Sequence, residues 1–446
     1  MKTVKEHLRE TIILAIPVII GQLGVIMMGI VDSLMVGELG AVQLAAASLA
    51  NSLFILIHIF GLGVAFAVTP LVAISVGAGK PDECRQLFRQ SMIVNIFFGV
   101  ILMAVMFLGA EMLQYMNQPP NVVYFARSYA RIQGVSLIVI GFFLTYKQFI
   151  EGFSIMRPAM IVTLLANIVN IFCNWILIFG NLGFPALGLD GAGWSTFASR
   201  LFLAVSLIWY TRRREDLKRY DMSFSFSPVN WRVIKKILSI GIPGGLQYLF
   251  ETGAFSFAVI MIGWLGTKQL AAHQIAINLA SVSFMAATGI SAAGSIRVGN
   301  AFGMKSISEI RKAGFSAILL GAAFMGICGI IFILMRDILP SFYINDKEVI
   351  SLASGLLVVA AFFQLSDGTQ AVGIGVLRGL TDVKAPTLIT FISYWIIGLP
   401  VGYYLAFIDH IGVTGVWFGL LAGLTSSAVL LTLRFNRKSK KIVSSF

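Results

Sequence analysis

The sequence predicts an all-α polytopic membrane protein with twelve transmembrane helices in two six-helix bundles. Of its 446 residues, 58% are hydrophobic and only 12% are charged, which is far from the average soluble domain. Apolar stretches recur along the whole chain, and each is long enough to cross a bilayer core of about 30 Å. The two halves of the sequence also match one another in a common register. A water-soluble fold is therefore excluded.

Apolar runs between charged or Gly/Pro-rich breaks define the helices in chain order. We expect them at residues 11–36, 50–76, 91–113, 124–147, 159–180, 191–211, 237–263, 276–302, 314–335, 350–374, 387–407 and 411–433.

The basic residues predict the orientation of these helices. An even number of spans places both termini on one side of the membrane. The termini and the loops on that side carry 26 Lys and Arg residues, against four in the opposite loops. Cytoplasmic loops retain positive charge, so we expect both termini to be cytoplasmic and the protein to lie in a bacterial cytoplasmic (inner) membrane. The net charge of +13 then reflects topology, and we expect no nucleic-acid partner.

An internal repeat becomes visible when the sequence is shifted along itself until Leu39 overlies Leu265. LGAVQLAAASLANSL, from Leu39, then matches LGTKQLAAHQIAINL, from Leu265, and Pro17 meets Pro243. Further along, with a small change of register, EGFSIMRPAMI corresponds to RGLTDVKAPTLI, and GLDG to GVTG. So many matches in nearly one register indicate a duplication.

The repeat predicts the domain organisation. Residues 1–211 form an N-terminal bundle, residues 212–236 a basic cytoplasmic linker, and residues 237–446 a C-terminal bundle with a short basic tail. Because each half has an even number of helices, both halves keep the same orientation and are related by a pseudo-two-fold axis along the membrane normal.

Two like bundles are typical of secondary transporters that work by alternating access. No soluble domain is left to hydrolyse a nucleotide, and VGAGKPDE lacks the spacing and the Ser or Thr of a phosphate-binding loop. The loops are also too short to build an enzyme active site. We therefore expect a non-enzymatic transporter that uses no cofactor and draws its energy from an ion gradient or from the gradient of the solute.

Three carboxylates within apolar helices are the main functional candidates: Asp32, Glu251 and Asp367. Ionisable groups inside a membrane cost several kcal/mol and usually serve a function. Glu251 lies fifteen residues after Lys236 and Asp367 eleven residues before Arg378, about 22 Å and 16 Å at helical rise. Glu251 and Asp367 are therefore expected to share one layer of the second half.

The residues alone leave the chemistry of this pair open. Without a basic residue at the same depth, the two carboxylates would either hold a proton or bind a cation such as Na+. The alternative is that each carboxylate only forms hydrogen bonds to a neighbouring helix. The single histidines have no second ligand at helical spacing, so we expect no transition-metal site.

Several polar and aromatic residues could line a cavity beside these acids. Asn167, Asn170 and Asn174 share one stripe of a helix. This stripe could line a wet cavity or hydrogen-bond between helices. Gln274 could line a cavity or pack between helices. Tyr248 and Phe363 flank the acidic positions, where aromatic rings suit flat hydrophobic cations, although most Phe residues would face lipid.

Taken together, several segments resemble the MATE family, the multidrug and toxic compound extrusion transporters, and most closely its bacterial NorM-like branch. The resemblance covers nearly the whole chain. It rests on VDSLMVG, TPLVAISVGAGK, EGFSIMRP, AAHQIAINL, RVGNAFG and LRGLTDVKAP.

The resemblance implies export of cationic amphipathic small molecules in exchange for inward Na+ or H+, with no obligate protein partner. It associates Glu251 and Asp367 with the coupling cation and the substrate, and Asp32 with coupling in the first half. Some relatives carry an aromatic hydroxyl one turn before the aspartate of the tenth helix, where this chain has Phe363. The choice between Na+ and H+ therefore stays open.

The alternative function is a flippase for lipid-linked or polysaccharide precursors. Such substrates are anionic, and their cavity should present Arg or Lys near the middle of the membrane. The clearest deep charges here are acidic, which favours organic cations.

Overall fold

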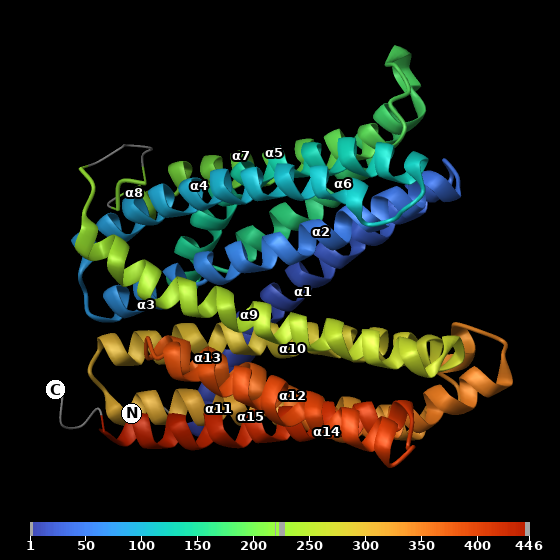
Figure 1. Ribbon diagram of the computed structural model, residues 1–446. Coiled ribbons are helices and arrows are strands. Elements are labelled where there is room, and N and C mark those ends of the chain that lie inside the picture. Colours follow the sequence, from blue (N-terminus) through green and yellow to red (C-terminus); the bar gives the residue numbers. More distant parts are fainter. Residues whose placement is uncertain (1–2, 219, 223–227, 442–446) are drawn as a thin grey trace. The chain divides into compact units, whose positions relative to one another are not determined.

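The computed structural model of the protein describes residues 3–218, 220–222 and 228–441. Within these residues the chain forms helices, turns and loops and no β-strand (Figure 1). Twelve helical spans are long and apolar enough to cross a membrane, which confirms the predicted fold class. The elements are α1 Val4–Gly37, α2 Ala41–Ala65, α3 Val68–Gly77, α4 Pro81–Met112, η1 Leu113–Tyr115, α5 Pro120–Gly152, α6 Arg157–Phe179, η2 Asn181–Gly183, α7 Leu189–Arg213, α8 Glu215–Lys218, α9 Trp231–Leu265, α10 Thr267–Gly303, α11 Ile307–Leu334, η3 Pro340–Phe342, α12 Lys347–Gly379, α13 Lys384–Phe391, η4 Ile392–Gly398, α14 Leu399–Tyr403, η5 Tyr404–Ile408 and α15 Val413–Lys441.

The chain divides into two compact units. The first unit spans residues 20–245, and the second unit combines the first nineteen residues with those from 246 onward. The start of α1 therefore belongs with the later helices, and the linker and the start of α9 belong with the earlier ones. The division of the sequence into 1–211, 212–236 and 237–446 follows the repeat and stays a prediction.

The repeat reappears in the helix boundaries. α2 and α10 begin at Ala41 and Thr267, and α3 and α10 end at Gly77 and Gly303. The sequence shift that brings Leu39 onto Leu265 also brings the two first residues together and the two last residues together. Both first residues lie about nine positions before the apolar runs expected at 50–76 and 276–302. Those expected starts are wrong because Ala, Leu and Gln, which are good helix formers, extend the helix beyond the apolar run.

One helix lies at the centre of each unit. In the first unit α5 packs against α2, α4 and α7, and in the second unit α12 packs against α10, α11 and α15. Glycines allow these close approaches. A Cβ added to Gly141 of α5 would lie 2.9 Å from the backbone oxygen of Asn95, and one on Gly375 of α12 would lie 2.4 Å from that of Ser291. Small residues at helix contacts are the usual basis of packing in membranes.

The first segment of α1 is fixed in the second unit by a buried arginine. Nη1 of Arg297 donates to the backbone oxygen of His7 and to the hydroxyl of Thr11, both at 2.6 Å, and Nη2 forms an ion pair with Glu10 at 3.0 Å. His7 also lies 3.3 Å from Glu309. Arg297 therefore has carboxylate and neutral partners that compensate for its burial.

The first segment of α9 is held in the first unit by glycine packing. A Cβ on Gly63 of α2 would lie 2.4 Å from Cα of Gly245, and Gly241 approaches Val64 in the same way.

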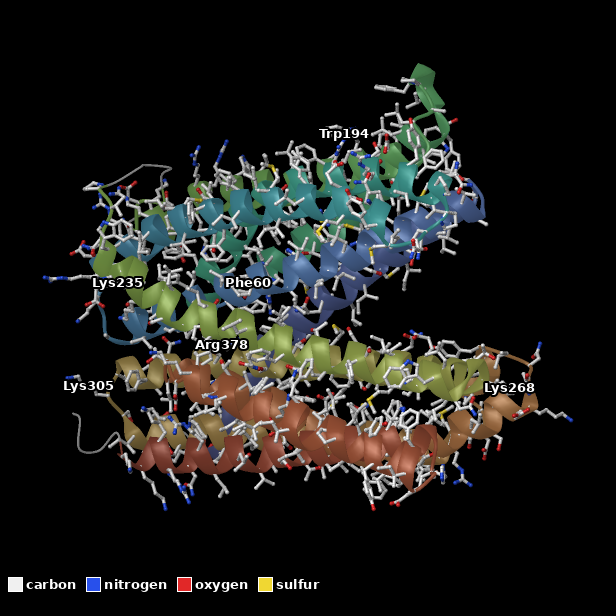
Figure 2. The ribbon with its side chains drawn as sticks, in the orientation of Figure 1. Phe60, Trp194, Lys235, Lys268, Lys305 and Arg378 are labelled. Carbon is white, nitrogen blue, oxygen red and sulfur yellow. The ribbon has the colours of Figure 1, made fainter. Side chains whose placement is uncertain are left out.

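α10 runs the length of the second unit, with Lys268 at one end and Lys305 just past the other (Figure 2).

The linker also docks on the first unit. Arg85 and Arg89 of α4 bind the carboxylate of Asp221 at 2.9 and 2.5 Å. The hydroxyl of Tyr146 donates to the backbone oxygen of Met222 at 3.2 Å. Part of the expected basic linker, residues 219 and 223–227, lies outside the described residues.

Candidate functional site

The three deep carboxylates fall into two groups, one in each unit. Asp32 lies on α1 in the first unit, whereas Glu251 of α9 and Asp367 of α12 both lie in the second unit. Among the residues that the structure describes, none of the three forms an ion pair within 4 Å. Asp32 and Glu251 instead accept hydrogen bonds from neutral polar groups.

In the second unit, Glu251 belongs to a short chain of hydrogen bonds. The amide nitrogen of Gln370 donates to Oε1 of Glu251 at 3.2 Å. The hydroxyl of Tyr394 donates to the amide oxygen of Gln370 at 3.1 Å. Gln370 and Tyr394 are fully buried. These bonds orient the donor side of the amide toward the carboxylate.

Asp367 lies one helical turn before Gln370 on α12 and is 5% exposed. It is within electrostatic range of Glu251. The structure therefore brings the two acids of the second half together. Two nearby carboxylates that are buried or half-buried repel each other, so a proton or a bound cation would stabilise the pair.

Tyr394 comes from an unusual segment of helix. The span Lys384–Ile408 contains two π-helical stretches, η4 and η5. π-Helical turns are rare and occur frequently at functional sites. Next to Tyr394 in η4, the indole nitrogen of Trp395 donates to the backbone oxygen of Phe250 at 3.0 Å. This bond ties η4 to α9 beside Glu251.

The other residues expected near the acids of the second unit lie in different surroundings. Tyr248 has the guanidinium of Arg378 over its ring at 5.6 Å. Phe363 is 1% exposed and packs against Phe255 and Trp417, so its ring belongs to the apolar core. Gln274 is exposed, and its amide donates to Asn278 at 3.1 Å.

In the first unit, Asp32 accepts hydrogen bonds from two helices. The amide nitrogen of Asn174 donates to Oδ1 at 2.6 Å, and the hydroxyl of Thr196 lies 3.2 Å from Oδ2. The same Asn174 nitrogen is 3.2 Å from the amide oxygen of Asn170. Both asparagines are fully buried. Asn167, in contrast, donates to the backbone of its own helix at Thr163.

The Asn170 and Asn174 stripe thus hydrogen-bonds between helices and also faces the acid. Carboxylate, amide and hydroxyl oxygens are the ligands that hard cations prefer. The Asp32 group and the Glu251–Asp367 pair both offer such oxygens. Among the described residues, no group of three or more His, Cys, Asp or Glu side chains could hold a metal ion.

Sequence reasoning missed three polar residues of these groups. Gln370 lies three residues after Asp367, so helical periodicity could have indicated it. Thr196 is one of several hydroxyl residues in α7 and has no distinguishing pattern. Tyr394 lies 24 residues after Gln370 on another span, and nothing in the sequence indicates a π-helical segment there.

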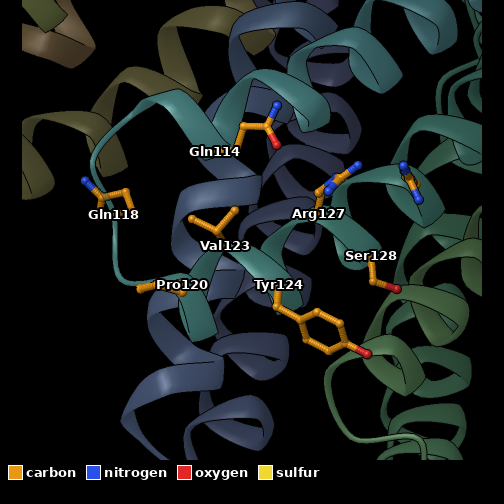
Figure 3. Close-up of a pocket in the computed structure, with 8 residues that line it drawn as sticks. Gln114, Gln118, Pro120, Val123, Tyr124, Arg127 and Ser128 are labelled. Carbon is orange, nitrogen blue, oxygen red and sulfur yellow. The ribbon is translucent and has the colours of Figure 1, made fainter.

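A pocket of about 610 Å³ lies where α4 ends and α5 begins (Figure 3). Its lining includes Tyr124, Ser128 and two arginines, Arg127 and Arg131. Both arginines form ion pairs with Glu111. The lining contains none of the candidate acids.

The family model described as MatE matches residues 17–176 and 243–404, two segments that begin at the prolines aligned by the repeat. A "Probable multidrug resistance protein NorM" of Rhizobium meliloti (strain 1021) is 35% identical over 98% of this chain and 94% of the relative. A "Multidrug resistance protein MdtK" of Photorhabdus laumondii is 32% identical over 99% of this chain and 98% of the relative.

Solved structures of similar proteins share the fold. The "Crystal structure of MATE in the bent conformation" has a TM-score of 0.90 at 20% identity and covers 100% of this chain and 99% of that one. The "Crystal structure of eukaryotic MATE transporter AtDTX14" has a TM-score of 0.88 at 19% identity and covers 98% of both chains. With its two matched segments and its relatives over nearly the full length, the chain belongs to the MatE family.

Proposed function

We propose that this chain is a secondary active multidrug efflux antiporter, which exports organic cations in exchange for inward Na+ or H+ by alternating access. Relatives that are 32–36% identical over most of their length are named multidrug resistance proteins. The two groups of acids within the helices supply what such an exchange requires, namely sites that either a small cation or an organic cation can neutralise.

The observation that carries this proposal is the Glu251–Asp367 pair. Asp367 is 5% exposed, the two acids lie within electrostatic range of each other, and neither has an ion-pair partner among the described residues. A site with two close negative charges attracts cations of either kind. Aromatic rings beside it, such as Phe250 and Phe391 with centroids 4.9 Å apart, suit flat hydrophobic substrates.

The exchange follows from linkage between the two cations. A coupling ion arriving from outside neutralises the Glu251–Asp367 pair and weakens its hold on a positively charged substrate. By reciprocity, the substrate weakens the hold on the coupling ion. The ion therefore favours the state that releases substrate outward, and loss of the ion on the other side resets the carrier. Asp32, with its oxygen neighbours, serves as the coupling site of the first unit.

The same proposal assigns the membrane and the orientation. The excess of Lys and Arg on the side of the termini supports cytoplasmic termini in a bacterial inner membrane. The transporter acts on cationic amphipathic small molecules, with no covalent chemistry, no cofactor beyond the coupling ion and no obligate protein partner.

Uptake of a fluorescent organic cation into inside-out proteoliposomes tests the proposal. A Na+ gradient and a pH gradient are imposed in separate experiments on the wild type, Glu251→Gln, Asp367→Asn and Glu215→Gln. Glu215 is a surface carboxylate in a weak pair with Lys218, so its variant controls for the loss of one negative charge. We expect one gradient to drive uptake in the wild type and the control, and neither gradient to do so in the two site variants.

Two results would contradict the proposal. If Asp367→Asn keeps its gradient-driven uptake, the acid pair does not couple the ion to the substrate. Folded wild-type protein that takes up no cation under either gradient would move the assignment to the flippase of lipid-linked precursors.

A further inference from the structure

Arg200 is a deep basic residue that the proposed exchange does not yet use. It lies on α7, and among the described residues no carboxylate is within 4 Å of its guanidinium. Its partners are neutral. Nη1 donates to the amide oxygen of Gln133 at 2.9 Å and to the hydroxyl oxygen of Ser136. The guanidinium carbon lies 4.4 Å from the centre of the Phe54 ring.

These partners are oriented to receive a cation. The amide nitrogen of Gln133 donates to Asn51 at 2.9 Å, which leaves its oxygen toward Arg200. The hydroxyl of Ser136 donates to its own helix backbone at 2.5 Å, which leaves its lone pairs for the guanidinium. Gln133 and Ser136 are buried. The packing of α2, α5 and α7 thus fixes one positive charge inside the first unit.

This charge belongs to the same polar layer as Asp32. Thr196, whose hydroxyl meets the Asp32 carboxylate at 3.2 Å, lies four residues before Arg200 and therefore on the same face of α7. Asp32 and Arg200 are within electrostatic range of each other. The two charges balance over a distance too long for a direct ion pair.

The repeat does not preserve this arginine at the matching position of the second unit. In the register that aligns GLDG with GVTG, Arg200 corresponds to Leu424, a fully buried apolar residue. In the second unit, Arg378 is the basic residue within electrostatic range of Glu251, but it lies near the end of α12, at a position that does not match Arg200 in the repeat. The position of Arg200 is therefore specific to the first unit and is not a consequence of the duplicated fold.

We propose that Arg200 is a fixed counter-cation that determines how tightly the Asp32 site holds the coupling ion. When Asp32 is free, the two charges compensate each other. When an ion occupies Asp32, the charge of Arg200 is left without compensation in a medium of low dielectric constant. Arg200 thus weakens ion binding enough for the ion to leave on the other side of the membrane. This inference rests on the proposed antiport.

The test compares variants that remove, keep or neutralise this charge. Arg200→Gln removes it, Arg200→Lys keeps it, and Gln133→Glu places a carboxylate beside an intact Arg200. The readout is the concentration of the driving ion at half-maximal dye uptake, together with the ion-dependent rise in thermal stability, which does not require transport. The Na+ and pH arms are run separately.

We expect Arg200→Gln and Gln133→Glu to lower the half-maximal concentration of the driving ion about tenfold, within the usual range of coupling between sites. Arg200→Lys should stay near the wild type. In an Asp32→Asn background, Arg200→Gln should produce no further change, which a merely structural role would not predict.

The results that would overturn the role of Arg200 differ from those that would overturn the antiport. If the wild type takes up dye but both charge variants keep its ion dependence, the role of Arg200 is overturned. If Arg200→Gln does not fold, an unchanged ion dependence in Gln133→Glu overturns it equally. If the wild type shows no uptake under either gradient, the proposed antiport itself fails.

Discussion

The hydroxyl of Tyr394 holds the amide of Gln370 at 3.1 Å, and this contact decides which end of the amide faces Glu251. With its oxygen occupied by Tyr394, Gln370 presents its nitrogen to the carboxylate at 3.2 Å. Without the hydroxyl, the amide could rotate and present its oxygen instead. A π-helical segment of one span thereby controls the surroundings of an acid on another.

Tyr394→Phe should therefore reduce transport while leaving the protein folded. The variant loses one buried hydrogen bond, worth about 1 kcal/mol or roughly fivefold in rate. The measurement is the initial rate of gradient-driven dye uptake. Tyr403→Phe on the same span is the control, because Tyr403 is half exposed and packs on Phe407. Equal rates in the two variants would contradict a role for the Tyr394 hydroxyl.

Thr196→Val should alter the ion dependence of transport, because it removes a hydroxyl from Asp32 and keeps the shape of the side chain. We expect the half-maximal concentration of the driving ion to rise severalfold, as for loss of one oxygen partner of a charged site. Thr163→Val is matched to it. Both threonines are 5% exposed, but the Thr163 hydroxyl bonds only to its own helix at Ala159. A similar change in both variants would assign the effect to packing.

Arg297→Met should destabilise the protein. It removes the ion pair with Glu10 and the hydrogen bonds to the backbone oxygen of His7 and to Thr11, and loss of hydrogen bonds to a charged group costs about 2 kcal/mol. Thermal unfolding in detergent should show a clearly lower midpoint. Arg336→Gln, in an exposed pair with Asp337, should unfold like the wild type. An unchanged midpoint in Arg297→Met would mean that Arg297 does not hold the first segment of α1.

Gly63→Ala should disturb the contact between α2 and the start of α9, because its Cβ would lie 2.4 Å from Cα of Gly245. We expect a lower unfolding midpoint and reduced uptake. Gly355→Ala is the matched control, since a Cβ there meets nothing within 4 Å and Ala in a helix interior is favoured over Gly by about 1 kcal/mol. A midpoint for Gly63→Ala as high as for Gly355→Ala would rule out this glycine contact.

Much of the fold could be predicted from the sequence. Hydropathy gives the number of spans, and the repeat relates the ends of α3 and α10 at Gly77 and Gly303. The acids could also be found, because a carboxylate in an apolar helix is conspicuous. The start of α10 at Thr267 could not, since polar residues such as His273 and Gln274 interrupt the apolar run although the helix continues through them.

Other features depend on contacts that no local pattern records. The first segment of α1 belongs to the second unit, where Arg297 binds it, and the first segment of α9 belongs to the first unit, where Gly245 packs. The spacing of Phe363 places it one turn from Asp367, but its ring packs in the core against Phe255 and Trp417. The hydroxyl near Glu251 comes instead from Tyr394, at a position that depends on π-helical geometry.

The most direct test of the account measures exchange without an imposed ion gradient. An organic cation is added to proteoliposomes loaded with buffer, and the movement of Na+ or H+ in the opposite direction is followed in the wild type and in Asp367→Asn. The account predicts that the organic cation drives one of these ions outward in the wild type and neither in the variant. Organic-cation uptake without any counter-movement of ions, or the same counter-movement in Asp367→Asn, would contradict it.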